Sequence, residues 1–335
     1  MTTEAKIHLA SSEFGTLWMT YIITSSRLIA YDFFKIKTID KEAQNILNSY
    51  ITEVQNVQNK IVNIFNNEEV VIPIGFNEDD EMKESETLYD DFFHIISLRE
   101  AMKLSLGRSA VYITTSYMKE VNDVFKLHLD ISNKYYMITT NYLLGKGVLA
   151  RSPSVTMQKQ VEFIEDINYM SGFNLFSDKR SLNMIEVGFI NEAIEANIWS
   201  MHLLTGFAQV SKESEVKKYL IEGKELAKEI ISELSALLSQ SDIQPPSTWV
   251  GKVTDSIQPP FSEKLMMYLT SIIATTALGF TALGTSFSMR NDLPLKLGLI
   301  SKNIFEYSKK GSKIMIKHKW MEQPPQMEDR NQLTK

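Results

Sequence analysis

Apolar residues recur at every third or fourth position along most of this chain, the spacing of an α-helix with one buried face. In the segment 40–66 these positions are Ala43, Leu47, Tyr50, Val54, Val57, Ile61 and Ile64. The stripes of 212–239 and 292–320 have the same spacing, and they include Gly223 and Gly311. Sustained stepping of this kind is what near-antiparallel packing of four helices requires. The pattern therefore predicts an all-α protein built from helical bundles.

The pattern divides into eight expected helices, four in each half of the chain. Their expected spans are 7–36, 40–66, 84–118, 121–147, 182–209, 212–239, 260–289 and 292–320. Residues 148–181 are expected to link the halves, with a short helix around Gln158–Tyr169. The one strand-like run, Val70–Ile74, contains Pro73, which disfavours a place inside a sheet. No sheet is predicted.

The two halves repeat each other. Matching motifs are Glu13-Phe14-Gly15 with Glu186-Val187-Gly188, Pro73-Ile74-Gly75-Phe76 with Pro246-Ser247-Thr248-Trp249, Met118 with Met289, and Pro153 with Pro325. All four matches share an offset of 171–173 residues, which indicates one structural unit that was copied and joined. We predict two domains, 1–165 with the linker and 170–335 with a C-terminal tail.

The connection between the second and third helices is long in both halves. It spans about 20 residues, whereas helix connections in bundles usually have roughly 2–8. A long crossover lets the third helix run parallel to the second, as in ferritin-like bundles. The predicted fold is two tandem ferritin-like four-helix bundles related by internal duplication.

Composition narrows the class of protein. The chain has 335 residues, of which 44% are hydrophobic and 23% charged, as in a globular protein. A net charge of −6 argues against a nucleic-acid groove, which needs a concentrated basic face. The absence of cysteine removes disulfides, thiol catalysis and zinc–thiolate sites. Met1–Lys6 has no basic and apolar pattern of a secretory signal, so we expect a cytoplasmic protein.

The segment Leu265–Met289 is uncharged over 25 residues, long enough to cross a bilayer. Nine of these residues carry a hydroxyl group, however, and the matching helix of the first half contains Arg99, Glu100, Lys103 and Arg108. Charged side chains of this kind are costly against lipid. We interpret the segment as the most buried helix of its bundle and expect no membrane contact.

Several motifs of the second half resemble a known family. They are Gly206–Val210, Val253–Ser256, Pro260–Met267, Ser288–Leu293 and Trp320–Gln326. In this order they resemble the tandem-repeat proteins of endospore-forming bacilli that are grouped as domain-of-unknown-function family 3231. The resemblance extends over nearly the whole chain and implies a duplicated ferritin-like bundle, but no activity. In the first half Val148–Pro153 replaces the Trp…Gln-Pro-Pro ending, so any role of that ending belongs to the second half.

A ferritin-like fold raises the question of a di-iron site. Such sites take Glu-x-x-His pairs from two helices, because residues three apart share a helix face. The chain has five histidines and no Glu-x-x-His pair, and Asp91-x-x-His94 is the nearest approximation. We therefore predict no metal site and no cofactor.

Comparison of the two copies identifies one polar pair. Glu195 and His202 align with Ile22 and Ile29 of the apolar stripe in the first half. If the two side chains were buried without hydrogen-bond partners, they would destabilise the folded state by several kcal/mol. One interpretation is a polar pocket in which Glu195 raises the pKa of His202 or both hold a ligand. The simpler interpretation, which we favour, places them at the edge of the core or against the other domain.

His128 poses a related question in the first half. It lies on the stripe with Val124, Ile131 and Tyr135 and aligns with Ile300. It is either a ligand-binding residue or a core histidine hydrogen-bonded to a hydroxyl or carbonyl group, and we favour the second.

We therefore expect a non-enzymatic structural or interaction protein of a spore-forming bacterium. Its partner would be an unknown protein or a further copy of itself, and not a nucleic acid. The spore or stress association comes from the family resemblance alone. The alternative is a small-molecule-binding protein or cryptic enzyme that uses a polar pocket around Glu195 and His202.

Overall fold

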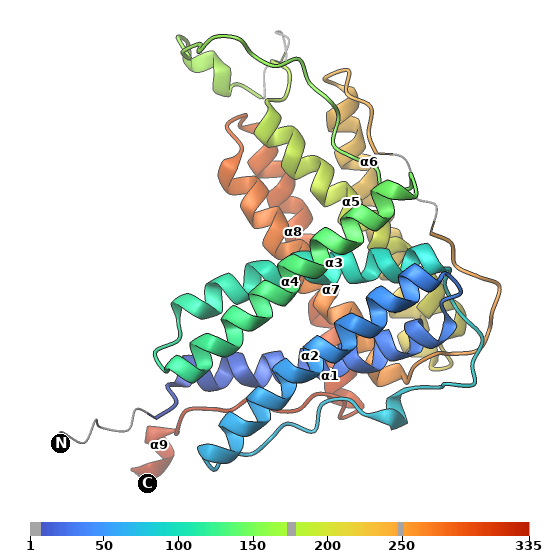
Figure 1. The fold of residues 1–335 in the computed structure, drawn as a ribbon. Helices are drawn as coiled ribbons and strands as arrows, with labels where there is room; N and C mark the ends of the chain where they lie inside the picture. Colours follow the sequence, from blue (N-terminus) through green and yellow to red (C-terminus); the bar gives the residue numbers. More distant parts are fainter. Residues whose placement is uncertain (1–7, 173–178, 247–250, 335) are drawn as a thin grey trace. The chain divides into compact units, whose positions relative to one another are not determined.

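The computed structural model describes residues 8–172, 179–246 and 251–334, and its helices follow one another as Figure 1 shows. The long helices are α1 Ser11–Lys37, α2 Lys41–Asn67, α3 Asp91–Thr114, α4 Lys119–Gly145, α5 Met184–Val210, α6 Ser214–Ser239, α7 Glu263–Phe287 and α8 Asp292–Lys317. Short helical turns are η1 Glu78–Asp80, η2 Ile167–Met170 and α9 Arg330–Leu333. The prediction of two four-helix bundles is confirmed.

The largest difference in helix bounds is at α3, which begins at Asp91 and not at 84. The Asp90 side chain accepts a hydrogen bond from the Phe93 N–H, which fixes the start of the helix there. The short helix expected around Gln158–Tyr169 is reduced to η2.

Helices α1–α4 form the first bundle, and their contacts establish its topology. Arg27 and Tyr31 of α1 donate hydrogen bonds to Ser105 and to the Ser97 carbonyl of α3. The residue numbers of the α3 partners thus decrease as those on α1 increase, so α1 and α3 are antiparallel. Since α1 also turns back directly into α2, helices α2 and α3 run parallel. This is the crossover arrangement predicted from the long connection.

The predicted stripe of α2 forms the core of this bundle. Its seven residues are all buried, from Ala43 to Ile64. Tyr50 lies between Tyr31 and Tyr135, with ring centroids 5.3 Å apart in both pairs. Edge-on aromatic contacts of this kind add to the stabilisation from burial alone.

Helices α5–α8 form the second bundle, where two glycines of the predicted stripes have a packing role. The Tyr219 and Tyr307 rings stack with centroids 4.2 Å apart. A β-carbon on Gly223 would lie 2.2 Å from the Tyr307 hydroxyl oxygen, and one on Gly311 would lie 2.3 Å from that of Tyr219. Each tyrosine therefore requires a glycine on the neighbouring helix.

The expectation that α7 is the most buried helix is wrong. In the most apolar window of α7, 39% of the residues are buried, whereas most residues of α5 are buried. The exposed face of α7 consists of Thr275, Gly279, Ala282, Leu283, Ser286 and Phe287. Among the described helices, α7 alone is long and apolar enough to cross a membrane. Length and composition are weak evidence for a span, since a core helix has both.

The compact units differ from the repeats 1–165 and 170–335 in three segments, 146–165, 260–265 and 319–335. Residues 260–265 and 319–335 pack with the chain up to Gly145, whereas 146–259 and 266–318 form the second unit. Within the first unit, Glu81 and Phe261 form an isolated antiparallel bridge. The division 1–165 and 170–335 stays a prediction about the repeats. The motif residues Ser247–Trp249 and the N-terminal Met1–Lys6 lie outside the described residues.

Candidate functional site

A buried glutamate stands at the same position in both repeats. Glu13, which is 0% exposed, accepts the N–H of Ala10 at 2.8 Å at the start of α1. Its other oxygen accepts the N–H groups of Tyr117 and Met118 at 2.7 and 2.6 Å. One carboxylate thus satisfies helix-terminal donors of α1 and joins them to the α3–α4 turn.

Glu186, also 0% exposed, repeats this arrangement in the second bundle. It accepts the N–H of Asn183 at 3.0 Å and those of Met289 and Arg290 at 3.1 Å each. The recurrence of glutamate in both copies therefore has a structural cause. Sequence reasoning found the repeated motif but not the contact, which joins residues more than a hundred positions apart.

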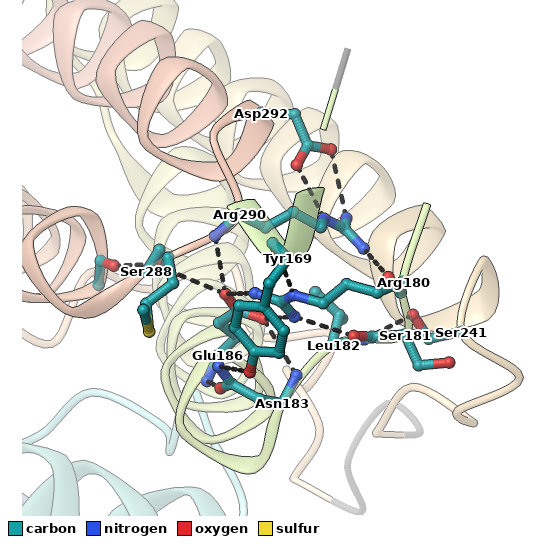
Figure 2. A network of polar contacts seen from close by, with 12 residues as sticks. Tyr169, Arg180, Ser181, Leu182, Asn183, Glu186, Ser241, Ser288, Arg290 and Asp292 are labelled. Carbon is teal, nitrogen blue, oxygen red and sulfur yellow. Dashed lines mark hydrogen bonds and ion pairs between the residues drawn. The ribbon is translucent and has the colours of Figure 1, made fainter. Parts of the chain in front are cut away.

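The second bundle adds charged partners around this glutamate, as Figure 2 shows. Arg180 donates to both oxygens of Glu186 at 2.8 Å, and its guanidinium lies 4.0 Å from the centre of the Tyr169 ring. Arg290 donates to the Asp292 carboxylate at 2.8 and 3.2 Å. Bidentate pairs of arginine and carboxylate are among the stronger hydrogen-bonded contacts in proteins.

The charge of Glu186 is strongly stabilised. Burial raises the pKa of this carboxyl, but the Arg180 guanidinium and the N–H groups of Asn183 and Arg290 outweigh burial and lower the pKa to about 2. A carboxylate held in this way stays ionised at neutral pH. Its hydrogen bonds join the start of α5 to the α7–α8 turn.

The interior of the first bundle contains a buried cation. Arg27 is 3% exposed and donates to the Ser105 hydroxyl at 2.5 Å and to the Ala101 carbonyl at 3.1 Å. Arg27 thus contacts hydroxyl and carbonyl dipoles of α3, which are weaker partners than a carboxylate.

His128 lies in the same interior. It is 4% exposed, and its Nδ1 is 2.9 Å from the Ser109 hydroxyl. Burial, and then the charges of Arg27 and Arg108, lower the pKa of His128 to about 3. The imidazole is therefore neutral at pH 7.

His94 is held in a similar way. Its Nδ1 is 2.8 Å from the Thr38 hydroxyl, and its ring stacks on Phe34 with centroids 4.4 Å apart. Burial lowers the pKa of His94 to about 3. Two buried neutral histidines thus join helices of the first bundle through hydroxyl groups.

Glu195 and His202 both lie on α5. Glu195 is 5% exposed and His202 is half-buried, and both side chains have interactions with other groups. The second bundle holds a cavity of about 30 Å³, whose α5 lining consists of Asn197, Ser200 and Leu204. The cavity does not touch Glu195 or His202, so their role as ligand residues stays a prediction.

The described residues also bear on metal binding. Among residues 8–172, 179–246 and 251–334, no group of three or more histidine, aspartate or glutamate side chains is placed to hold a metal ion.

Two charged side chains, Glu322 and Lys264, bind the loop between α2 and α3, and we call this pair the charged clamp. Glu322 of the C-terminal segment accepts the N–H groups of Ile74 and Gly75 at 2.9 and 2.6 Å. Lys264, at the start of α7, donates to the Gly75 carbonyl at 2.8 Å. Both polar groups of Gly75 are thus bonded by side chains from the second repeat, within the first compact unit.

The segment before α7 adds to this clamp. Ser262 donates its hydroxyl to Asp80 at 2.6 Å, and the Ser262 N–H donates to the Asp80 carbonyl at 3.0 Å. Phe261 packs against Phe33 and Phe34 with ring centroids 5.3 and 6.1 Å apart. Residues of the second repeat therefore complete the core of the first unit.

Known proteins and protein families resemble this chain to different extents. No curated protein matches the chain significantly. Among solved structures, a putative spore coat protein from Bacillus halodurans C-125 is similar, with 16% sequence identity and a TM-score of 0.41. That alignment covers 45% of this chain and 98% of the other. The model of a family described as "Protein of unknown function (DUF3231)" matches residues 1–161 and again 170–333. The chain therefore belongs to the DUF3231 family and contains two copies of its domain.

Proposed function

We propose that this protein is a structural or interaction protein without catalytic activity. The observation that supports this most directly is the state of its buried titratable groups. His94, His128 and Glu186 have pKa values of about 3, 3 and 2, and each is bonded to a neighbouring helix or turn. These groups stabilise the arrangement of helices.

Acid–base catalysis would call for the opposite shifts. A general acid or base works best when its pKa lies near the working pH. A group whose pKa lies near 2 or 3 holds a single protonation state at pH 7 and is poorly matched to proton transfer there. Here burial lowers the pKa of both histidines, with a further contribution from Arg27 and Arg108 at His128. Hydrogen bonds from Arg180 and backbone N–H groups lower the pKa of Glu186 against the effect of burial. We infer that evolution used these positions for packing.

The proposed setting is the cytoplasm of a spore-forming bacterium, in association with the spore or a stress response. This part of the proposal is supported by the family resemblance of the motifs from Gly206 to Gln326. The proposed partner is a protein, either unknown or a second copy of the chain.

Native mass spectrometry of the protein purified from its own host tests the proposal. We expect the mass of the bare chain or of a multiple of it. A small molecule or metal retained at a constant ratio to the chain would contradict a structural role.

The second candidate is a small-molecule-binding protein that uses Glu195 and His202. It is favoured by the burial of the Glu195 carboxylate, with a half-buried imidazole two helical turns further along α5. In this case the native spectrum would show an adduct that is lost in Glu195→Gln and in His202→Asn. The control is Glu229→Gln, which changes an exposed carboxylate on α6 and should leave the adduct in place.

A further inference from the structure

We propose that the C-terminal tail, residues 319–334, docks on the first unit of a second copy of this chain as well as on its own. The acceptor is the loop of residues 72–77 together with Lys264. This inference rests on the proposed interaction role and names the partner: another molecule of the same protein.

The acceptor loop recognises a carboxylate. The N–H groups of Ile74 and Gly75 point at one side chain, Glu322, and bind its two oxygens separately. Gly75 has a φ of 65°, in the left-handed region that glycine adopts without strain. Consecutive N–H groups around such a residue form a concave site for anions.

The first repeat builds this concavity itself. The Ser25 hydroxyl of α1 accepts the N–H of Phe76 at 3.2 Å and lies directly beneath Gly75. A β-carbon on Gly75 would be 2.5 Å from the Ser25 oxygen. Glycine is therefore required both by the backbone conformation and by the close approach of α1.

A positive charge completes the acceptor. Lys264 donates to the Gly75 carbonyl, and its ammonium group lies 4.5 Å from the centre of the Phe76 ring. The ammonium group also lies 3.9 Å from the Asp80 carboxylate, so only part of its charge attracts an anion bound at Gly75. An acidic side chain on an extended segment is the chemistry that fits.

The tail is held in a way that allows exchange. The chain leaves the second unit at His318 and joins the first at Lys319. Beyond Glu322, residues 323–334 are all exposed, so releasing them uncovers little apolar surface. A tail from another copy offers the same Glu322 to the same acceptor, and exchange of identical segments is a low-cost route to association.

The sequence makes this contact one-directional. At the offset of 172 residues, Ala150 of the first repeat stands where Glu322 stands in the second. The end of the first repeat therefore lacks the carboxylate. Each copy then has one competent tail and one acceptor, which are bonded to each other within the single chain. Exchange of the tails between copies joins the chains through the same contacts.

Cysteine cross-linking of the full-length protein tests the exchange, because the chain has no cysteine of its own. One copy carries Ile74→Cys beside the acceptor and a second copy carries Gln323→Cys beside Glu322. A short bismaleimide should link the two copies, and the linked fraction should rise with concentration and after joint refolding. It should fall several-fold when the tail copy also carries Glu322→Gln.

The controls separate docking from collision and from intramolecular contact. Gln55→Cys places a thiol on the exposed face of α2 and reports random collisions with the Gln323→Cys copy. A chain with both Ile74→Cys and Gln323→Cys reports linkage within one molecule.

The proposal would be overturned if the double variant became linked within one molecule while the linked fraction of the mixed sample never exceeded that of the Gln55→Cys control. A lack of linkage in both samples would do the same. Either result would exclude tail exchange while leaving the native mass spectrum, and hence the structural role, unaffected. Conversely, a bound ligand in that spectrum would contradict the structural role without affecting the cross-linking.

Discussion

Replacing Glu186 with glutamine measures how much one buried carboxylate stabilises the second bundle. Glu186 receives two hydrogen bonds from Arg180 and three backbone N–H groups from Asn183, Met289 and Arg290. Glutamine has the same shape, but its amide NH₂ would face N–H donors. Glu186→Gln therefore removes the charge and leaves buried donors without an acceptor.

The pKa shift gives the magnitude. The pKa of Glu186 falls from 4.5 to about 2 in the folded protein. One pKa unit corresponds to about 1.4 kcal/mol, so the shift amounts to a free energy of about 3 kcal/mol. We take this as an upper value, since part of the site reaches solvent through Arg180, which is partly exposed.

The sign follows from proton linkage. Because the folded pKa is depressed, the stabilisation is present above pH 4.5 and is lost as the pH falls towards 2. The variant has no carboxylate to protonate at this position. The difference in unfolding free energy between wild type and Glu186→Gln should therefore be about 2–3 kcal/mol at pH 7 and shrink steadily below pH 4.5.

Urea unfolding followed by circular dichroism at pH 7, 5 and 3 provides the assay. The matched control is Glu328→Gln in the exposed tail, which should change stability by less than about 0.5 kcal/mol. A loss below 1 kcal/mol at pH 7 would refute the reasoning, as would a difference that is the same at pH 7 and pH 3.

Three further predictions concern packing and titration. Gly223→Ala should cost about 2 kcal/mol in urea unfolding, because its β-carbon meets the Tyr307 ring. The cost should be smaller in a Tyr307→Leu background, and equal costs would contradict the contact. Gly75→Ala should lower the free energy of unfolding by about 1–2 kcal/mol, because Gly75 has a φ of 65° and a β-carbon there would meet Ser25. It should also weaken the tail cross-link, and an unchanged cross-link would be inconsistent with the carboxylate site. The pKa of His128 is about 3 when folded and 6.5 otherwise, so the unfolded state takes up the proton first. The free energy of unfolding should therefore fall as the pH is lowered from 6.5 to 3, and the fall should be smaller in His128→Gln. If the urea midpoint at pH 4 had fallen equally in wild type and variant, this interpretation of His128 would be contradicted.

Local periodicity was enough to predict the helices and the duplication. The stripe from Ala43 to Ile64 is buried as expected, because a residue's place on a helix depends only on its distance along the chain. The long loop after α2 also indicated the parallel course of α2 and α3, since a short turn would force an antiparallel pair.

The candidate site was less accessible to sequence reasoning. Comparison of the two copies drew attention to Glu195 and His202, where they differ. The buried glutamates that join each first helix to a distant turn, Glu13 and Glu186, were visible only as a repeated motif. Their partners Met118 and Arg290 lie more than a hundred residues away, and nothing in the local pattern specifies such a pairing.

Local patterns in the amino-acid sequence were sufficient to predict the eight long helices, the two copies and the positions of the buried stripes. The packing of residues 260–265 and the C-terminal tail with the first unit became visible in the folded structure. The folded structure also showed that α7 is only partly buried. The physical reason is that periodicity specifies which face of a helix is buried but not which segment buries it. The partner is chosen by contacts such as those of Glu322 with Gly75, which form only when distant parts of the chain meet.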